Sequence, residues 1–125
     1  MAHVQNIDLP TGFRFAGVAC GIKASAGKRD LSLIVADRDV VATGVYTQNA
    51  VVAAPVILCR QRTPTDRARA IVINSGNANA CTGKRGEADA NRMASCVAET
   101  LAVGTQADQV LVMSTGVIGR YLPME

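Results

Sequence analysis

Uninterrupted apolar runs mark two segments of the chain as strands. Residues 70–73 read AIVI and are followed by a cluster of Gly and Asn residues. Residues 110–113 read VLVM and are followed by Ser114, Thr115 and Gly116. Such runs leave no position for a solvated face, so each predicts a buried strand that ends in a loop containing glycine.

A helical pattern separates these two strands. Apolar side chains recur at helical spacing between residues 87 and 103, namely Ala90, Met93, Ala94, Val97, Ala98 and Leu101. Polar side chains occupy the opposite face, and Gly104 is placed to end the helix. We expect Thr82 and Gly83 to begin the turn that leads into it. The predicted order is therefore strand, loop, helix, strand.

The first half of the chain has shorter β-rich runs. Residues 13–24 mix small and apolar residues as a strand does, and residues 31–37 and 40–49 form two further runs. We expect Asp37 and Asp39 to be surface residues of the turn between these two runs, in a hairpin or meander.

Two later segments give weaker signals. Residues 53–60 fit either a strand or a short helix beginning at Pro55, and periodicity does not decide between them. Residues 60–69 combine four Arg residues with Pro64 and Asp66, which predicts a solvated loop. Strands followed by an alternation of strand and helix place the chain in the α/β (α+β) class.

Composition limits the kind of protein further. The 125 residues suffice for one domain, or a piece of one, and 49% of them are hydrophobic against 3% aromatic, so the core is expected to be aliphatic. A net charge of +3 is too small and too scattered for a nucleic-acid-binding surface. We expect residues 1–11 to be a polar leader. With neither a secretory signal nor an apolar run long enough for a membrane span, the sequence predicts a soluble cytoplasmic protein without membrane contact.

Cysteine and histidine usage excludes several kinds of site. The cysteines are Cys20, Cys59, Cys81 and Cys96, and no two of them form a C-x-x-C pair. We therefore expect small buried thiols and no metal site. The only histidine is His3, in the leader, which argues against a Ser–His–acid triad within the chain. The nucleophile elbow also fails, because Val112 stands at its first glycine position.

The loop after residue 73 resembles a phosphate-binding loop only weakly. Ala78 and Arg85 occupy two positions at which that motif requires glycine and a hydroxyl residue. Backbone N–H groups together with Gly83 and Lys84 could still hold an anion, so an anion- or nucleotide-binding module is one alternative.

Three long motifs, in order, resemble the ornithine acetyltransferase family of arginine biosynthesis. They are TGVYTQNAVVAAPV, RAIVINSGNANACTG and STGVIGRYLPME. The resemblance extends from about Gly12 to Glu125. It implies an N-terminal-nucleophile-like fold, incomplete in this chain, with a mixed sheet packed with helices.

The resemblance also implies an activity. In this family a precursor cleaves itself before a threonine, and the resulting α and β chains stay together, commonly as an α2β2 heterotetramer. The new N-terminal threonine takes acetyl from N-acetylornithine and passes it to glutamate, and bifunctional members also use acetyl-CoA as donor. No permanently bound cofactor is implied. Residues 1–125 correspond to the N-terminal part of the α chain, so the nucleophile lies outside this sequence and the segment alone is expected to be inactive.

The same resemblance assigns a role to Thr115 and Gly116, which match the oxyanion hole of the family. A hydroxyl and a backbone N–H that are already aimed at the reacting carbonyl stabilise the charge of acyl transfer. For Asn74, Asn77 and Asn79 two interpretations stay open: loop-forming side chains that bind nearby backbone, or part of the active-site wall. A related N-terminal-nucleophile peptidase, which would end the same chemistry with water, is a second alternative.

Overall fold

The chain folds into one mixed sheet covered by helices on one face. The computed structural model describes residues 8–25, 27–101 and 104–125. Its sheet has the order β1-β2-β3-β4, formed by Phe13–Val18, Leu31–Ala42, Thr65–Asn77 and Val110–Val117. The first three strands are antiparallel neighbours, whereas β3 and β4 are parallel. This confirms the predicted α+β class.

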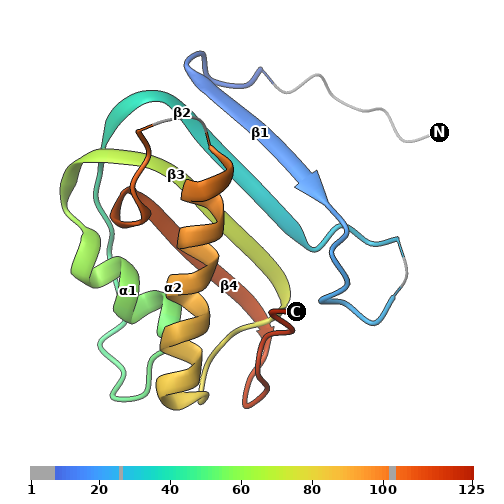
Figure 1. Ribbon diagram of the computed structural model, residues 1–125. Helices are drawn as coiled ribbons and strands as arrows, with labels where there is room; N and C mark the ends of the chain where they lie inside the picture. Colours follow the sequence, from blue (N-terminus) through green and yellow to red (C-terminus); the bar gives the residue numbers. More distant parts are fainter. Residues whose placement is uncertain (1–7, 26, 102–103) are drawn as a thin grey trace.

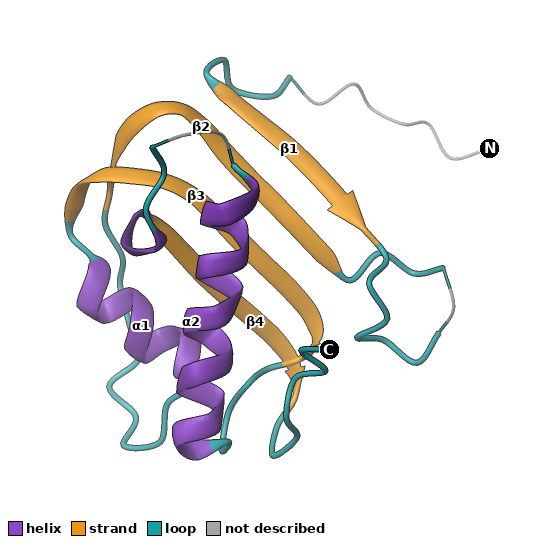
Figure 2. Cartoon of the chain, viewed as in Figure 1, coloured by secondary structure: helices purple, strands orange, loops and turns teal. Residues whose placement is uncertain are grey.

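Two helices supply the second layer. Helix α1 (Ala54–Arg62) connects β2 to β3, and α2 (Gly83–Thr100) connects β3 to β4 through the short 3-10 helix η1 (Ala107–Gln109). Both lie on the same side of the sheet (Figures 1 and 2). Among the described residues, no helix combines the length and apolar character that a membrane span requires.

The core lies between the helices and the inward side of β3 and β4. Its main buried members are Leu58, Cys59, Ala70, Val72, Ala90, Met93, Ala94, Val97, Val110 and Val112. The apolar stripe predicted for α2 is the face that it buries, as the helical spacing requires. The helix is longer at its start than predicted, because it begins at Gly83. It ends at Thr100, before Gly104, since Leu101 is already extended.

The predicted hairpin turn at Asp37–Asp39 is wrong. Strand β2 runs through it as one continuous strand to Ala42, with a shift of register between Val35 and Val40. Charged residues are tolerated there because they are exposed and lie beside arginines of the neighbouring strands. Arg14 Nε lies 3.0 Å from Asp37 Oδ1, and an Arg69 nitrogen lies 3.5 Å from Asp39 Oδ1.

The ambiguous segment before residue 60 is helical, with Pro55 in the first turn of α1, where its missing N–H costs nothing. The solvated loop predicted for residues 60–69 is wrong, because β3 already begins at Thr65. The Arg62 guanidinium is half-buried and donates to the carbonyl oxygens of Ala107 and Val110 at 2.7 and 2.6 Å. These bonds attach the end of α1 to the beginning of β4.

The expectation of buried thiols is only partly correct. Cys59 is buried, Cys96 is intermediate, and Cys20 and Cys81 are exposed. Cys59 Sγ donates to Val112 O at 3.1 Å, and burial raises the pKa of this thiol. Cys59 is therefore a neutral core residue that joins α1 to β4. Of the predicted leader, residues 1–7 lie outside the described part, and residues 8–11 are exposed.

The face of the sheet opposite the helices is apolar, and we call it the uncovered face. Strand pairing places twelve residues on it: Phe13, Phe15, Gly17, Ser32, Ile34, Ala36, Ile71, Ile73, Ser75, Leu111, Met113 and Thr115. Phe13, Phe15 and Met113 are 38%, 41% and 53% exposed. An apolar sheet face of this extent usually marks an interface.

A core substitution tests this packing. Val112 is 1% exposed, so Val112→Ala should lower the free energy of unfolding by about 2–3 kcal/mol, from lost burial and the cavity left behind. Val41→Ala is the matched control, because Val41 is 79% exposed and should change stability by less than about 0.5 kcal/mol. Urea denaturation measures both, and equal effects of the two substitutions would contradict the assigned core.

Candidate functional site

The carboxyl ends of the two parallel strands bring both glycine-containing segments to one edge of the sheet (Figure 1). The register pairs Asn74 with Ser114, Ser75 with Thr115, and Gly76 with Gly116. The sequence placed these segments after two separate strands, and the structure places them side by side. Ligands bind preferentially at such an edge in open sheets with helical crossovers.

Two glycines allow the strand ends to touch. Gly76 has φ +115° and Gly116 has φ +135°, a backbone conformation that other residues rarely adopt. A Cβ on Gly116 would lie 2.3 Å from the carbonyl carbon of Gly76 and 2.5 Å from the nitrogen of Asn77. These are backbone atoms and cannot move aside as a flexible side chain can. The contact therefore requires glycine at position 116.

Asn74 and Asn77 at the end of β3 and Asn79 in the loop that follows, which we call the first loop, bind backbone groups, as the loop-forming interpretation expects. Asn74 Nδ2 donates to Asn77 O at 2.8 Å, and Asn79 Nδ2 donates to Gly86 O at 2.8 Å. Asn77 Nδ2 donates to the carbonyl oxygens of Arg120 and Tyr121, both at 3.1 Å. All three asparagines are buried, and their amides hold the backbone of this loop and of the segment after Gly116.

Backbone hydrogen bonds join the same two segments beyond the strands. Ala78 N donates to Val117 O at 2.9 Å, and Gly119 N donates to Ala80 O at 2.8 Å. The loop after Gly116 is therefore held along its length by the loop after β3.

Thr115 and Gly116 are both exposed. Because side chains alternate along a strand, Thr115 falls on the uncovered face with Met113, and Ser114 falls on the helix face. The Thr115 hydroxyl is thus directed away from the helices.

Two buried polar atoms lie next to this pair. Asn74 Oδ1 and Ser114 Oγ, on residues paired in register, have no hydrogen-bond partner among the described residues. Unpaired buried polar atoms cost free energy and are uncommon in folded proteins. Ser114 directly precedes Thr115 in the chain, so this local cost falls beside the Thr115–Gly116 pair.

Asp30 is a residue of this region that the sequence did not single out. Its carboxylate accepts from Cys20 N at 2.7 Å and from Lys23 N at 2.9 Å, and its carbonyl oxygen accepts from Ser75 N at 2.8 Å. The backbone N–H groups of Cys20 and Lys23 hold the pKa of this carboxyl well below its ordinary value. An aspartate just before a strand could have suggested such a turn.

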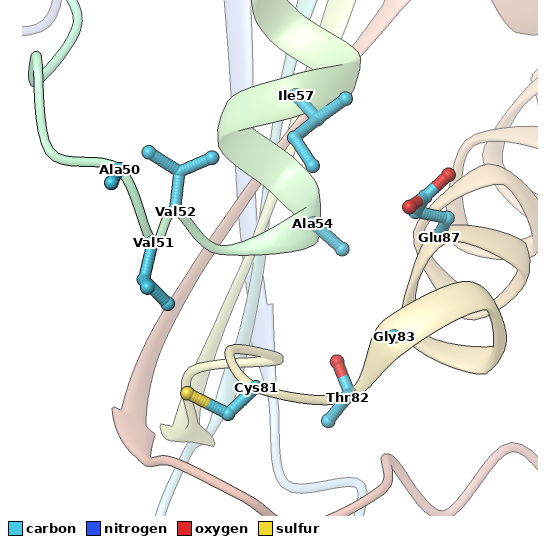
Figure 3. Close-up of a pocket in the computed structure, with 9 residues that line it drawn as sticks. All are labelled: Ala50, Val51, Val52, Ala54, Ile57, Cys81, Thr82, Gly83 and Glu87. Carbon is cyan, nitrogen blue, oxygen red and sulfur yellow. The ribbon is translucent and has the colours of Figure 1, made fainter.

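A separate cleft of about 280 Å³ lies between α1 and the start of α2 (Figure 3). Its lining is mostly apolar and includes Val51, Ile57 and Gly83, with Glu87 on the α2 side. The Thr82 hydroxyl donates to Asn79 Oδ1 at 2.8 Å and so serves the loop itself. A carboxylate in the lining disfavours anions, so the Gly83–Lys84 hypothesis gains no support here. Within the described ranges there is also no group of three His, Cys, Asp or Glu residues that could hold a metal ion.

Two solved structures share the fold of this chain. The ornithine acetyltransferase of Mycobacterium tuberculosis, solved in complex with ornithine, matches with a TM-score of 0.87 and 50% identity, over 92% of this chain and 61% of that one. The arginine biosynthesis bifunctional protein ArgJ of Bacillus halodurans matches with a TM-score of 0.81 and 39% identity, over 91% and 58%.

The chain belongs to the ArgJ family, which it matches over residues 14–125. The arginine biosynthesis bifunctional protein ArgJ of Rhodopirellula baltica is 61% identical over 117 residues, and that of Geobacter sulfurreducens is 53% identical over 114 residues. These alignments cover 94% and 91% of this chain, yet only 28% of each relative.

The glycine contact predicts an unequal response of two glycines. Gly116→Ala should destabilise the protein by more than about 3 kcal/mol, because positive φ costs about 1–2 kcal/mol and the backbone contact adds to it. Gly119 also has a positive φ, +72°, but open space around it, so Gly119→Ala should cost only about 1–2 kcal/mol. Thermal and urea unfolding measure the difference. Equal losses would show that the contact between the strand ends is unimportant.

The Asp30 carboxylate predicts a dependence of stability on pH. Because its folded-state pKa is depressed, its contribution is fully present above the unfolded pKa of about 3.9 and is lost as the pH falls toward the folded value. Asp30→Asn should therefore lower the melting temperature at pH 7 and flatten its decline below about pH 4. The exposed Asp66→Asn is the control. Parallel melting curves for parent and Asp30→Asn across this range would exclude the effect.

Proposed function

We propose that this chain is the N-terminal part of the α chain of a bifunctional ornithine acetyltransferase. The whole enzyme moves acetyl from N-acetylornithine to glutamate in the cytoplasm, and acetyl-CoA serves as a further donor without any permanently bound cofactor. Membership of the ArgJ family and the ornithine acetyltransferase of M. tuberculosis support this. The observation that carries it is the exposed Thr115–Gly116 pair at the end of a buried strand, braced by Gly76.

In the proposed reaction the nucleophile is a threonine outside this chain. Its oxygen attacks the acetyl carbonyl carbon, and the π electrons move onto the carbonyl oxygen, which becomes negative. The Thr115 hydroxyl and the Gly116 N–H stabilise that oxygen. Collapse breaks the bond between the carbonyl carbon and the ornithine nitrogen; the amine leaves with the proton that the threonine hydroxyl gave up, and an acyl-threonine remains. The amine of glutamate then attacks the acyl carbon, the threonine oxygen leaves and takes up a proton from that amine, and N-acetylglutamate is released. The oxyanion hole is used in both halves.

The exposed apolar side chains of the uncovered face favour a partner chain in the proposed enzyme. Thr115 lies on that face among exposed apolar side chains, so the group that completes the site approaches from that side. We assign this position to the β chain, which carries the nucleophile, and the assembly to α2β2. The chain spans 28% of the length of its R. baltica relative, so most of the proposed enzyme lies in other sequence.

Removing the Thr115 hydroxyl tests the proposal. In enzyme assembled from this segment and the remainder of the protein, Thr115→Ala should lower the rate of acetyl transfer from N-acetylornithine to glutamate by about 10²–10³-fold, as loss of one oxyanion donor does. Thr100→Ala is the matched control, because that exposed hydroxyl at the end of α2 binds Cys96 O and its loss should change the rate by less than about 3-fold.

An unchanged rate in Thr115→Ala would remove this residue from the mechanism. If acyl-ornithine were hydrolysed without transfer to glutamate, the activity would be that of the related peptidase class. Heat from ATP or phosphate that disappears in Lys84→Ala would instead favour the anion-binding module.

A further inference from the structure

We propose that Asn77 is a positioning residue of the acetyl-transfer reaction. It holds the loop after Gly116, so that the Gly116 N–H stays directed at the carbonyl oxygen of the substrate. This rests on the proposed function. Asn77 does not reach the reacting atoms in this role. It acts through the backbone that carries Gly116.

Every polar group of the Asn77 side chain is engaged. Its Nδ2 donates to the carbonyl oxygens of Arg120 and Tyr121, both at 3.1 Å, and its Oδ1 accepts from Asn79 N at 2.8 Å. The side chain is 6% exposed, so water does not compete effectively for these partners. One amide therefore fixes both the turn before Asn79 and the return of the chain toward Leu122.

Asn77 also lies where the strand register changes. It pairs with both Thr115 and Val117, whereas the residue before it, Gly76, pairs with Gly116. The backbone of Asn77 thus borders the peptide unit of Gly116 on one side, and its side chain holds the loop that continues from it.

Near its far end the loop has a further contact, the Arg85 guanidinium 4.2 Å from the centre of the Tyr121 ring. Residues 117–121 are exposed, and the next buried residue is Leu122, 2% exposed. Besides the two bonds from Asn77, the first loop gives this segment the bonds of Ala78 to Val117 and of Gly119 to Ala80. Loss of the Asn77 amide would therefore leave the backbone between Gly119 and Leu122 without its hydrogen bonds to the end of β3 and loosen the segment that continues from Gly116.

A hydrogen-bond donor is required at this position, and a carboxylate would be repelled. Asn77→Asp keeps the shape and the bond from Asn79 N, but it replaces the donor with a negative charge facing two carbonyl oxygens. Misplacing catalytic groups by about 1 Å can cost as much as 10²-fold in rate. We expect kcat to fall by about 10- to 100-fold with a change of less than about 3-fold in KM for N-acetylornithine.

The test is a double-mutant cycle in the assembled enzyme. The variants are Asn77→Asp, Thr115→Ala and their combination, with kcat expressed per active site titrated by acyl-enzyme formation. If Asn77 acts through the hole that Thr115 and Gly116 form together, the loss of rate in the double variant should be smaller than the product of the two single losses. The control is Asn91→Asp, an exposed asparagine of α2 whose side chain also donates to a backbone carbonyl, that of Glu87.

Each outcome decides the question. A merely structural role would lower the melting temperature and the number of active sites but leave kcat per site unchanged, which would overturn the proposal. Independent losses that multiply in the double variant would overturn it as well. If Thr115→Ala itself has no effect, the proposed function fails first, and the positioning role fails with it. Should Asn77→Asp not fold, Asn77→Ser removes the amide without adding charge and carries the same prediction.

Discussion

The contact between Gly76 and Gly116 is the constraint on which the rest of this structure depends. Two parallel strands can end side by side in any sheet, but here their backbones approach so closely that no Cβ fits at position 116. The close approach aligns the two glycine-containing loops, and their hydrogen bonds follow from that alignment. A rigid backbone is what a preorganised oxyanion hole needs, since donors that must be oriented during the reaction lose much of their effect.

The buried polar groups around this contact are of two kinds, those that are hydrogen-bonded and those that are not. Asn77 and Asn79 bind backbone carbonyl oxygens of neighbouring segments, and Asp30 binds backbone N–H groups of the loop that packs beside Gly76. Asn74 Oδ1 and Ser114 Oγ are left unpaired. Such unpaired atoms cost stability, so the region combines a well-satisfied frame with a local cost directly beside the candidate site.

The sequence predicts the elements whose pattern is local. The uniform apolar run of β3 and the stripe of α2 each need only their own residues to be recognised. The Asp37–Asp39 segment misleads, because its charges look like a turn but are compensated by Arg14 and Arg69 on adjacent strands. For Thr115 and Gly116, only the resemblance to a family motif predicts a role in the reaction. The role of Asn77 could not be read at all, since its partners lie 43 and 44 residues away and only folding brings them together.

The direction of Thr115 connects the site to the uncovered face. Helices protect the face that carries Ser114, and alternation along β4 directs Thr115 to the other face, beside Met113. A charge-stabilising site works best when water is excluded, because low dielectric strengthens its hydrogen bonds. The helices of this chain cannot provide that exclusion, since they lie on the opposite side of the sheet. In the proposed enzyme, a partner that covers the apolar face would also close the site, so that burial of Phe13, Phe15 and Met113 and formation of a dry oxyanion hole would be a single event.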